Sequence, residues 1–187
     1  STWSEKKPGT LAGSDVEIGD LYDDEVLGSK NYSGGYGRYG GSGFQYLFNV
    51  QQLERQEAGK SMLEYAHISD KNARLRIHLL PYQKQEIFRA DGYNKPRAKD
   101  YTLKYLVART KSEGEGNALK STFVSVLEPF NTSAYVQRSD LISVTGPKTA
   151  VAVSVTRQNA QDIVINDQTN AKKKVADFDI ETDASNA

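Results

Sequence analysis

The chain has 187 residues, with 24 basic and 24 acidic side chains and no cysteine. Its length supports one sizeable core in one or at most two domains. Because the formal net charge is zero, no global positive field attracts phosphates, and we expect no nucleic-acid partner. The absence of cysteine excludes thiol nucleophiles, disulfides and thiolate metal sites. No segment approaches the roughly 20 apolar residues that span a bilayer, so we expect no membrane span.

Residues 1–43 are expected to form an irregular arm, rich in glycine and tyrosine, that packs on the domain following it. The first residues lack a signal-peptide hydrophobic stretch and an initiator methionine, which is typical of a mature form or an excised domain. A carboxylate cluster in the arm suits calcium, which favours several oxygen ligands. The candidate ligands are Asp20, Asp23 and Asp24. The alternative is a solvated acidic loop, since the ligand ladder of an EF-hand is missing. We expect no other cofactor.

A glycine-rich loop follows, with six glycines between Gly34 and Gly43. Residues 35–40 formally match the dinucleotide-binding fingerprint, but that fingerprint requires a helix directly after the glycines. Here the strand-like run Phe44–Val50 follows instead, so we reject nucleotide binding.

The aromatic and arginine side chains of this loop are candidate contacts for carbohydrate. Aromatic rings stack on the apolar faces of sugars, and arginine pairs with a uronate carboxylate. The alternative is that the tyrosines only cover the sheet. The candidate residues are Tyr32, Tyr36, Arg38 and Tyr39.

Residues 44–182 are predicted to form one antiparallel β-sandwich of two packed sheets, and residues 183–187 a frayed tail. In Ala73–Leu79, apolar and polar residues alternate, which predicts that Leu75, Ile77 and Leu79 face inward. The stretch Gln51–Lys60 is predicted to be a turn, because it presents no apolar face. The expected strands are Phe44–Val50, Met62–Ile68, Ala73–Leu79, Gln85–Ala90, Leu103–Thr110, Ser121–Leu127, Leu141–Val144, Ala150–Thr156, Gln161–Asn166 and Val175–Ile180.

Turn residues between these runs predict hairpins in an all-β fold. Pro129 is expected to end the strand before it, because proline lacks the amide hydrogen that a ladder requires. The expected turns are Ser69–Asn72, Asp91–Asn94, Gly114–Asn117, Gly146–Pro147 and Gln158–Asn159.

No catalytic residue is assigned. Proton transfer near neutral pH most often uses histidine, and the chain has only His67 and His78. Each occupies a strand-like position and is interpreted as a histidine on a sheet face. Glu128 has the side chain of a catalytic acid, but it lacks a partner carboxylate at a suitable spacing.

Several strings, in this order and spacing, resemble the C-terminal β-rich region of heparinase II/III-like polysaccharide lyases. The resemblance covers roughly Pro8 to Asn166. The strings are Pro8–Gly13, Gly19–Asp24, Gly41–Val50, Tyr105–Arg109 and Ser121–Phe130.

In that family a helical toroid and a β domain enclose a cleft in which uronic-acid polysaccharides are cut by β-elimination. The family's catalytic residues lie upstream of the matching region, and this sequence contains no toroid. The resemblance therefore implies a non-catalytic accessory domain of a periplasmic or extracellular lyase, with the catalytic toroid and acidic polysaccharide as partners. The alternatives are a stand-alone carbohydrate-binding module and a structural interaction domain.

Overall fold

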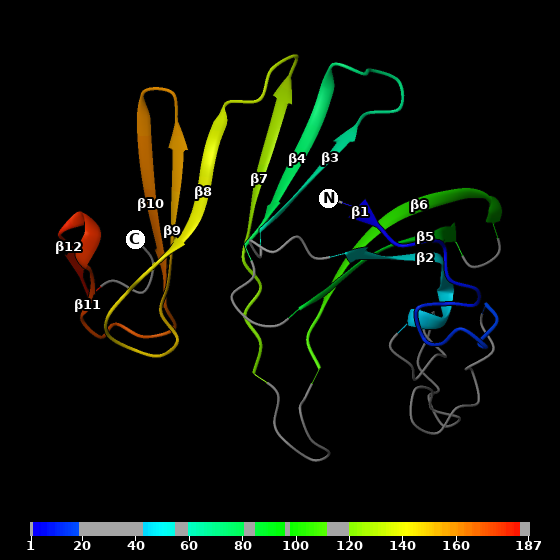
Figure 1. Ribbon diagram of the computed structural model, residues 1–187, viewed down its shortest axis with the longest axis horizontal. Coiled ribbons are helices and arrows are strands. Elements are labelled where there is room, and N and C mark those ends of the chain that lie inside the picture. The colour runs from blue at the N-terminus through cyan, green and yellow to red at the C-terminus, as the bar shows by residue number, and fades with distance from the viewer. Residues whose placement is uncertain are drawn as a thin grey trace. The chain divides into compact units, whose positions relative to one another are not determined.

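The computed structural model describes residues 2–18, 43–54, 60–80, 85–95, 98–111 and 120–183. Within these ranges the chain forms β-strands and two short 3-10 helices, with no α-helix (Figure 1). All strand pairs in this part of the chain are antiparallel. The predicted all-β, antiparallel class is confirmed.

The chain forms two compact units, each made of two separate stretches of sequence. Unit 1 comprises Ser1–Arg55 and Lys84–Lys120, and unit 2 comprises Gln56–Gln83 and Ser121–Ala187. The predicted boundaries after residues 43 and 182 stay predictions.

Unit 1 is built on a four-stranded sheet of order β1-β2-β5-β6. Its core brings together the buried side chains of Leu11, Val50, Phe88 and Ala90. Leu11 comes from the N-terminal arm, where its amide donates to the Leu47 carbonyl oxygen at 2.8 Å. This part of the arm therefore follows β2 and covers the sheet. The strands are β1 (Thr2–Trp3), β2 (Leu47–Glu54), β5 (Glu86–Lys95) and β6 (Ala98–Arg109).

The predicted limits of β2 were wrong at both ends. Phe44–Tyr46 forms the 3-10 helix η2, and the strand continues to Glu54, where a turn was expected. A β-bulge explains the error: the register with β5 shifts between Phe48 and Gln51, and Asn49 has a positive φ of 52°. The extra residue puts Val50 and Leu53, three positions apart, among the buried side chains. Buried residues three positions apart do not show the two-residue period by which a strand is recognised in a sequence.

Gly92 does not form a turn, contrary to the prediction for Asp91–Asn94. It lies within β5, opposite Leu103 of β6. A Cβ at this position would lie 2.7 Å from Cε2 of Tyr105 and 3.0 Å from Cδ2 of Leu47. The glycine is therefore explained by the close approach of neighbouring side chains, which no local pattern reveals.

Unit 2 contains two three-stranded sheets and a C-terminal hairpin. The orders are β3-β4-β7 and β10-β9-β8, while β11 pairs with β12. The strands are β3 (Ser61–Ala66), β4 (Ala73–Leu79), β7 (Ser125–Asn131), β8 (Val136–Ile142), β9 (Val151–Arg157), β10 (Ala160–Asn166), β11 (Lys173–Val175) and β12 (Ile180–Thr182).

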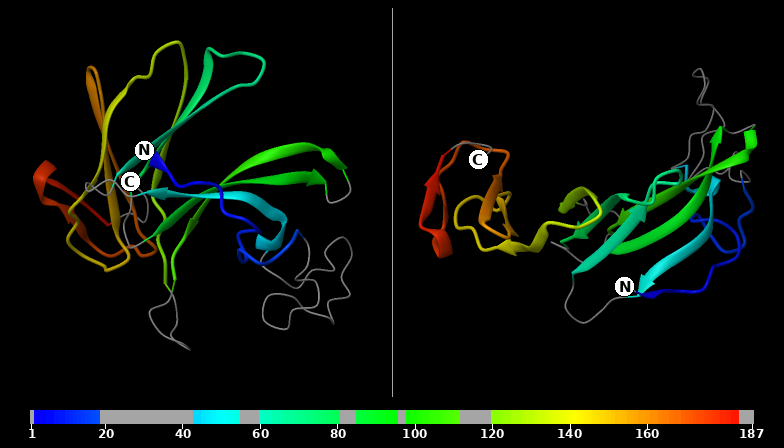
Figure 2. Two further views of the ribbon diagram at one scale, coloured as in Figure 1. Left: turned by 45° about the vertical axis from the view of Figure 1, so that its right-hand side comes forward. Right: turned by 90° about the horizontal axis from the view of Figure 1, so that it is seen from above.

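The hairpin β11–β12 covers one face of the β8–β10 sheet, beside which it lies in both views of Figure 2. Ala152, Ile165 and Val175 are the buried residues of this core. The run Val175–Ile180, predicted as one strand, is interrupted by the 3-10 helix η3 (Ala176–Phe178) and by Asp179, whose φ is 50°. The chain thus reverses within that run and becomes a hairpin.

Pro129 lies inside β7, opposite Leu75 of β4, and does not end the strand as predicted. The position is compatible with proline because β7 is the outer strand of its sheet, where an amide hydrogen on the free side is not needed. On β4, Leu75, Ile77 and Leu79 are half-buried, whereas the polar His78 is buried. Both sides of β4 are therefore partly covered.

Three of the predicted turns are confirmed as connections between neighbouring strands. Ser69–Asn72 joins β3 to β4, and the Asp70 carboxylate accepts the Asn72 amide at 3.0 Å. Gln158–Asn159 joins β9 to β10, and Gly146–Pro147 lies between β8 and β9. Gly114–Asn117 lies outside the described residues.

Candidate functional site

The residues predicted to contact carbohydrate or calcium lie outside the described part of the chain. Both hypotheses therefore stay predictions. These residues are Tyr32, Tyr36, Arg38 and Tyr39 for carbohydrate, and Asp20, Asp23 and Asp24 for calcium. Among the described residues, there is no group of three or more histidine, aspartate or glutamate side chains that could hold a metal ion.

The Glu128 carboxylate on β7 has several polar partners in unit 2, and its side chain is 0% exposed. One oxygen, Oε1, accepts the backbone amides of Tyr135 at 2.6 Å and Val136 at 2.7 Å. The other, Oε2, lies 3.0 Å from His78 Nε2 and 3.7 Å from Arg76 Nη1. Glu128 thus connects β4, β7 and the start of β8.

Burial by itself raises the pKa of Glu128. The amide of Val136, the ring of His78, the amide of Tyr135 and the charge of Arg76 together outweigh it, so the net pKa lies below the ordinary value of 4.5. The carboxylate is therefore ionised near neutral pH. A general acid needs the opposite shift, so this environment suits an anchor for neighbouring strands and not a proton donor.

The two histidines differ in their surroundings. His78 is 8% exposed and has its Nε2 directed at Glu128. His67 lies just past β3, is exposed, and accepts the Ser69 amide on Nδ1 at 3.3 Å. The sequence did not link His78 to Glu128, 50 positions away. Their neighbourhood follows from the β4–β7 register, which places Arg76 opposite Glu128.

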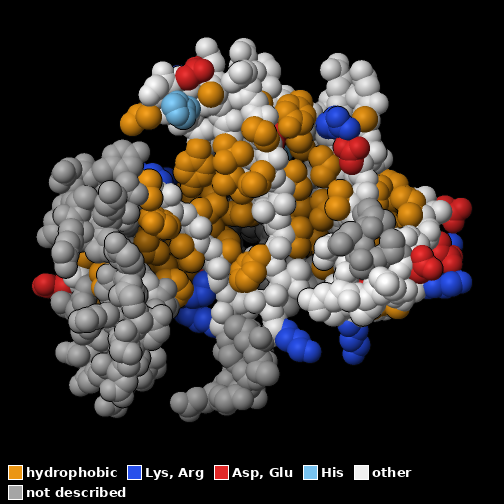
Figure 3. All heavy atoms as spheres, turned by 180° about the vertical axis from the view of Figure 1, so that it is seen from behind, with side chains coloured by type: hydrophobic (Ala, Val, Ile, Leu, Met, Phe, Trp, Pro, Cys, Tyr) orange, Lys and Arg blue, Asp and Glu red, His pale blue; other side chains and the backbone are white. Residues whose placement is uncertain are grey.

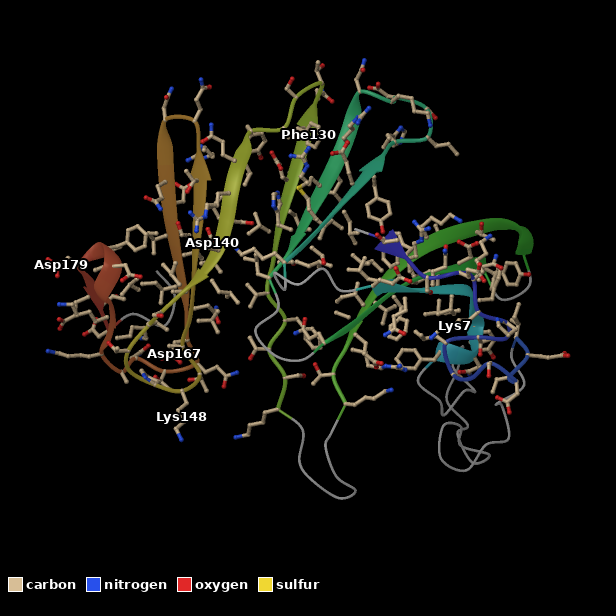
Figure 4. The ribbon with its side chains drawn as sticks, viewed as in Figure 1. Lys7, Phe130, Asp140, Lys148, Asp167 and Asp179 are labelled. Carbon is tan, nitrogen blue, oxygen red and sulfur yellow. The ribbon has the colours of Figure 1, made fainter. Side chains whose placement is uncertain are left out.

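A second buried charge lies at the end of unit 2 where Asp167 and Lys148 are labelled in Figure 4. The Thr149 and Thr169 hydroxyls donate to Asp167, and the Gln168 amide does so at 2.8 Å. These bonds, with the Lys173 ammonium 3.5 Å from Oδ2, lower the pKa of Asp167 to about 2.

Lys173 donates to the Thr169 carbonyl oxygen at 3.2 Å, and its side chain is fully buried. The cluster fastens β11 to the loop after β10. Its partners belong to the chain itself, so it reads as a structural anchor.

The described part of unit 2 also has a groove of about 640 Å³. Residues 121–127 line it together with Val151, Val153 and Val155 of β9 and Val164 of β10. At its rim the apolar side chains of Phe123, Leu127 and Val164 are 51%, 60% and 53% exposed. Exposed apolar side chains gathered in one place commonly mark a site of interaction with another surface or a ligand.

The sequence carried one signal for this groove. The run Val151–Val155 has apolar residues on both sides of the strand. Antiparallel strands that face water on one side alternate apolar and polar residues, whereas strands covered on both sides do not.

Unit 1 has a smaller hollow of about 470 Å³, lined by residues that include Lys7, Glu54 and Glu86. Lys7 donates to the Gln52 side chain at 3.2 Å. Nearby, the Arg89 guanidinium lies 4.6 Å above the ring of Trp3. Glu86 in this hollow pairs with Arg109 at 3.0 Å and with Lys111 at 3.3 Å, both of unit 1.

No protein-family model matches the chain, and no curated protein or solved structure matches it. The likeness to heparinase II/III-like lyases therefore rests on the sequence strings alone. In the described ranges, no helix has the length and apolar character needed to cross a bilayer.

Proposed function

We propose that this chain is a non-catalytic accessory β domain of a heparinase II/III-like polysaccharide lyase. The full-length parent would cleave uronic-acid-containing polysaccharide by β-elimination, in the periplasm or outside the cell, with a helical toroid as the catalytic partner. The ordered sequence strings motivate the proposal, and the all-β architecture is compatible with it.

The non-catalytic part of the proposal rests on the contacts that two buried ionisable side chains make within the chain. β-Elimination requires a base to remove the proton next to the uronate carboxylate and an acid to protonate the leaving oxygen. The buried His78 is directed at Glu128, and Glu128 accepts two backbone amides. Both side chains therefore hold strands together, which is consistent with a non-catalytic, structural role for this domain.

The first test is the reading frame upstream of the Ser1 codon. A helical toroid encoded there is the expected result. A frame that starts close to this codon with a signal peptide would contradict the proposal and favour a free-standing module.

The second test is lyase activity of the 187-residue chain on heparin-like, chondroitin and alginate substrates, followed as absorbance of the unsaturated product. We expect no turnover, with a commercial lyase as the positive control on each substrate. Clear turnover would refute the non-catalytic assignment.

A further inference from the structure

The two faces of the unit 1 sheet differ in character. On one face, Phe88 and Ala90 of β5 are buried in the core. Arg89 and Asp91 alternate with them along β5 and therefore point to the other side, which we call the outer face. The directly opposed residues on β2 and β6 extend this face, since paired residues point to the same side of a sheet. The outer face includes Phe48, Gln51, Arg89, Asp91, Tyr93 and Lys104.

Aromatic rings lie at both ends of the outer face. The ring centroids of Phe48 and Tyr93 are 5.0 Å apart, and at the other end the Arg89 guanidinium lies 4.6 Å from the centroid of the Trp3 ring. All three rings are half-buried, so part of each reaches solvent. At the usual rise of a strand, Arg89 and Tyr93 are roughly 13 Å apart along β5. That distance accommodates more than one sugar ring.

Positive charge predominates among the groups that meet on this face. Arg89 is exposed, and its Nε donates to an uncharged amide oxygen of β2 at 3.0 Å, a bond that leaves its charge unneutralised. The Lys104 ammonium, whose side chain is 68% exposed, pairs with Asp91. Burial raises the pKa of Asp91, but the Lys104 ammonium, an amide hydrogen bond and the charge of Lys6 lower it below its ordinary 3.8. Three cations thus surround one carboxylate.

Aromatic rings and excess positive charge together restrict the ligand. Apolar side chains alone do not, since Figure 3 shows hydrophobic side chains at the surface over several strands. A positive face attracts an anion, half-exposed rings stack on the apolar faces of sugars, and a guanidinium pairs with a carboxylate. A polynucleotide binds through many phosphate contacts, more than this small excess of charge provides. The combination therefore favours an acidic saccharide.

We propose that the outer face of the β1-β2-β5-β6 sheet binds an acidic oligosaccharide. Phe48 and Tyr93 stack on its sugar rings, and Arg89 pairs with a uronate carboxylate. The Trp3 ring holds the guanidinium in place, which reduces the cost of ordering it on binding. These residues differ from the loop residues predicted from the sequence, and the inference does not depend on the lyase proposal. Since the attraction is partly electrostatic, binding weakens as salt is raised.

The chain carries its own reporter for this site, because Trp3 is its single tryptophan and lies beside Arg89. The test is titration of the full 187-residue chain with alginate oligosaccharides, followed by tryptophan fluorescence at low and high salt. We expect a saturable change that weakens in high salt. A neutral cello-oligosaccharide of the same length should bind clearly more weakly. So should an oligoglutamate, which carries carboxylates without sugar rings.

Three variants locate the site. Arg89→Gln removes the charge but keeps a hydrogen-bonding amide, and it should weaken binding about tenfold or more. Tyr93→Leu keeps an apolar side chain without the ring and should weaken binding severalfold. Arg138→Gln is the matched control, because Arg138 on β8 of unit 2 also has an exposed side chain, at 73%. It should bind like the wild type.

Thermal unfolding of each variant shows whether its fold is retained. A wild type that binds no acidic oligosaccharide overturns the proposal, whatever the upstream reading frame and the lyase assays show. A folded Arg89→Gln variant that binds like the wild type also overturns it, as does equal binding of the oligoglutamate or tighter binding of a single-stranded oligonucleotide. Binding that is lost in Arg38→Gln but kept in Arg89→Gln would assign the ligand to the glycine-rich loop instead.

Discussion

Replacing Glu128 tests whether one buried carboxylate holds the two sheets of unit 2 together. Glu128→Ala leaves the amides of Tyr135 and Val136 without their acceptor and removes the partner of His78. Hydrogen bonds to a charged group contribute about 1.5–3 kcal/mol each, and Glu128 accepts two of them from backbone amides. We therefore expect Glu128→Ala to lower the free energy of unfolding by about 3–5 kcal/mol.

Glu128→Gln separates charge from shape. The glutamine oxygen can still accept the two amides, and the new NH₂ group faces His78 and Arg76. We expect a loss of about 1–2 kcal/mol, clearly smaller than for alanine. The matched control is Glu181→Gln, since the exposed Glu181 lies 3.9 Å from Lys172 and should change stability by less than about 0.5 kcal/mol.

Urea denaturation followed by circular dichroism measures the three free energies. Hydrogen exchange of the Val136 amide gives a local measurement, because this amide donates to Glu128 at 2.7 Å. If Glu128→Ala costs no more than Glu181→Gln, or if the Val136 amide exchanges as slowly as in the wild type, the anchoring role is refuted.

The same carboxylate gives a pH dependence whose sign follows from its lowered pKa. Its stabilising contribution is fully present above the ordinary value of 4.5 and is lost as pH falls through the lower, folded-state pKa. Glu128→Gln should therefore lose less stability than the wild type over that acidic range. A parallel acid dependence in the two proteins would contradict the lowered pKa of Glu128.

Three further predictions concern single positions. Gly146→Ala should destabilise the fold by about 1–3 kcal/mol, measured by thermal unfolding. Gly146 has a φ of 131°, and a Cβ there would lie 2.7 Å from the Lys172 carbonyl oxygen. An unchanged melting temperature would contradict this close approach. Asp167→Asn should lose less stability than the wild type between about pH 4 and pH 2, since the folded-state pKa of Asp167 is about 2. Urea midpoints measured across that range check this, and a pH dependence equal to that of the wild type would contradict the role of the cluster. Gly92→Ala should cost about 1 kcal/mol or more through the contact with Tyr105, and Gly43→Ala, where a Cβ has open space but φ is 78°, is a control for backbone strain alone.

Part of the fold could be predicted because its causes are local. The residues between β3 and β4 and between β9 and β10 reverse the chain through their own turn chemistry, and strand runs such as Ala73–Leu79 carry alternation within a few residues. The candidate sites on the arm came from local composition in the same way. They lie outside the described residues and stay hypotheses.

The remaining features depend on contacts between distant segments. Strand pairing determines three of them: the bulge at Asn49, the contact of Gly92 with Tyr105, and the place of Pro129 on an outer strand. The two anchors depend on it as well, since Glu128 meets His78 across 50 positions and Asp167 meets Thr149 across 18. By itself, then, the sequence determined that this is an antiparallel β protein with hairpins at its turn residues. Only the tertiary structure decided which carboxylates are buried and which apolar face is left open, because burial depends on which strands become neighbours.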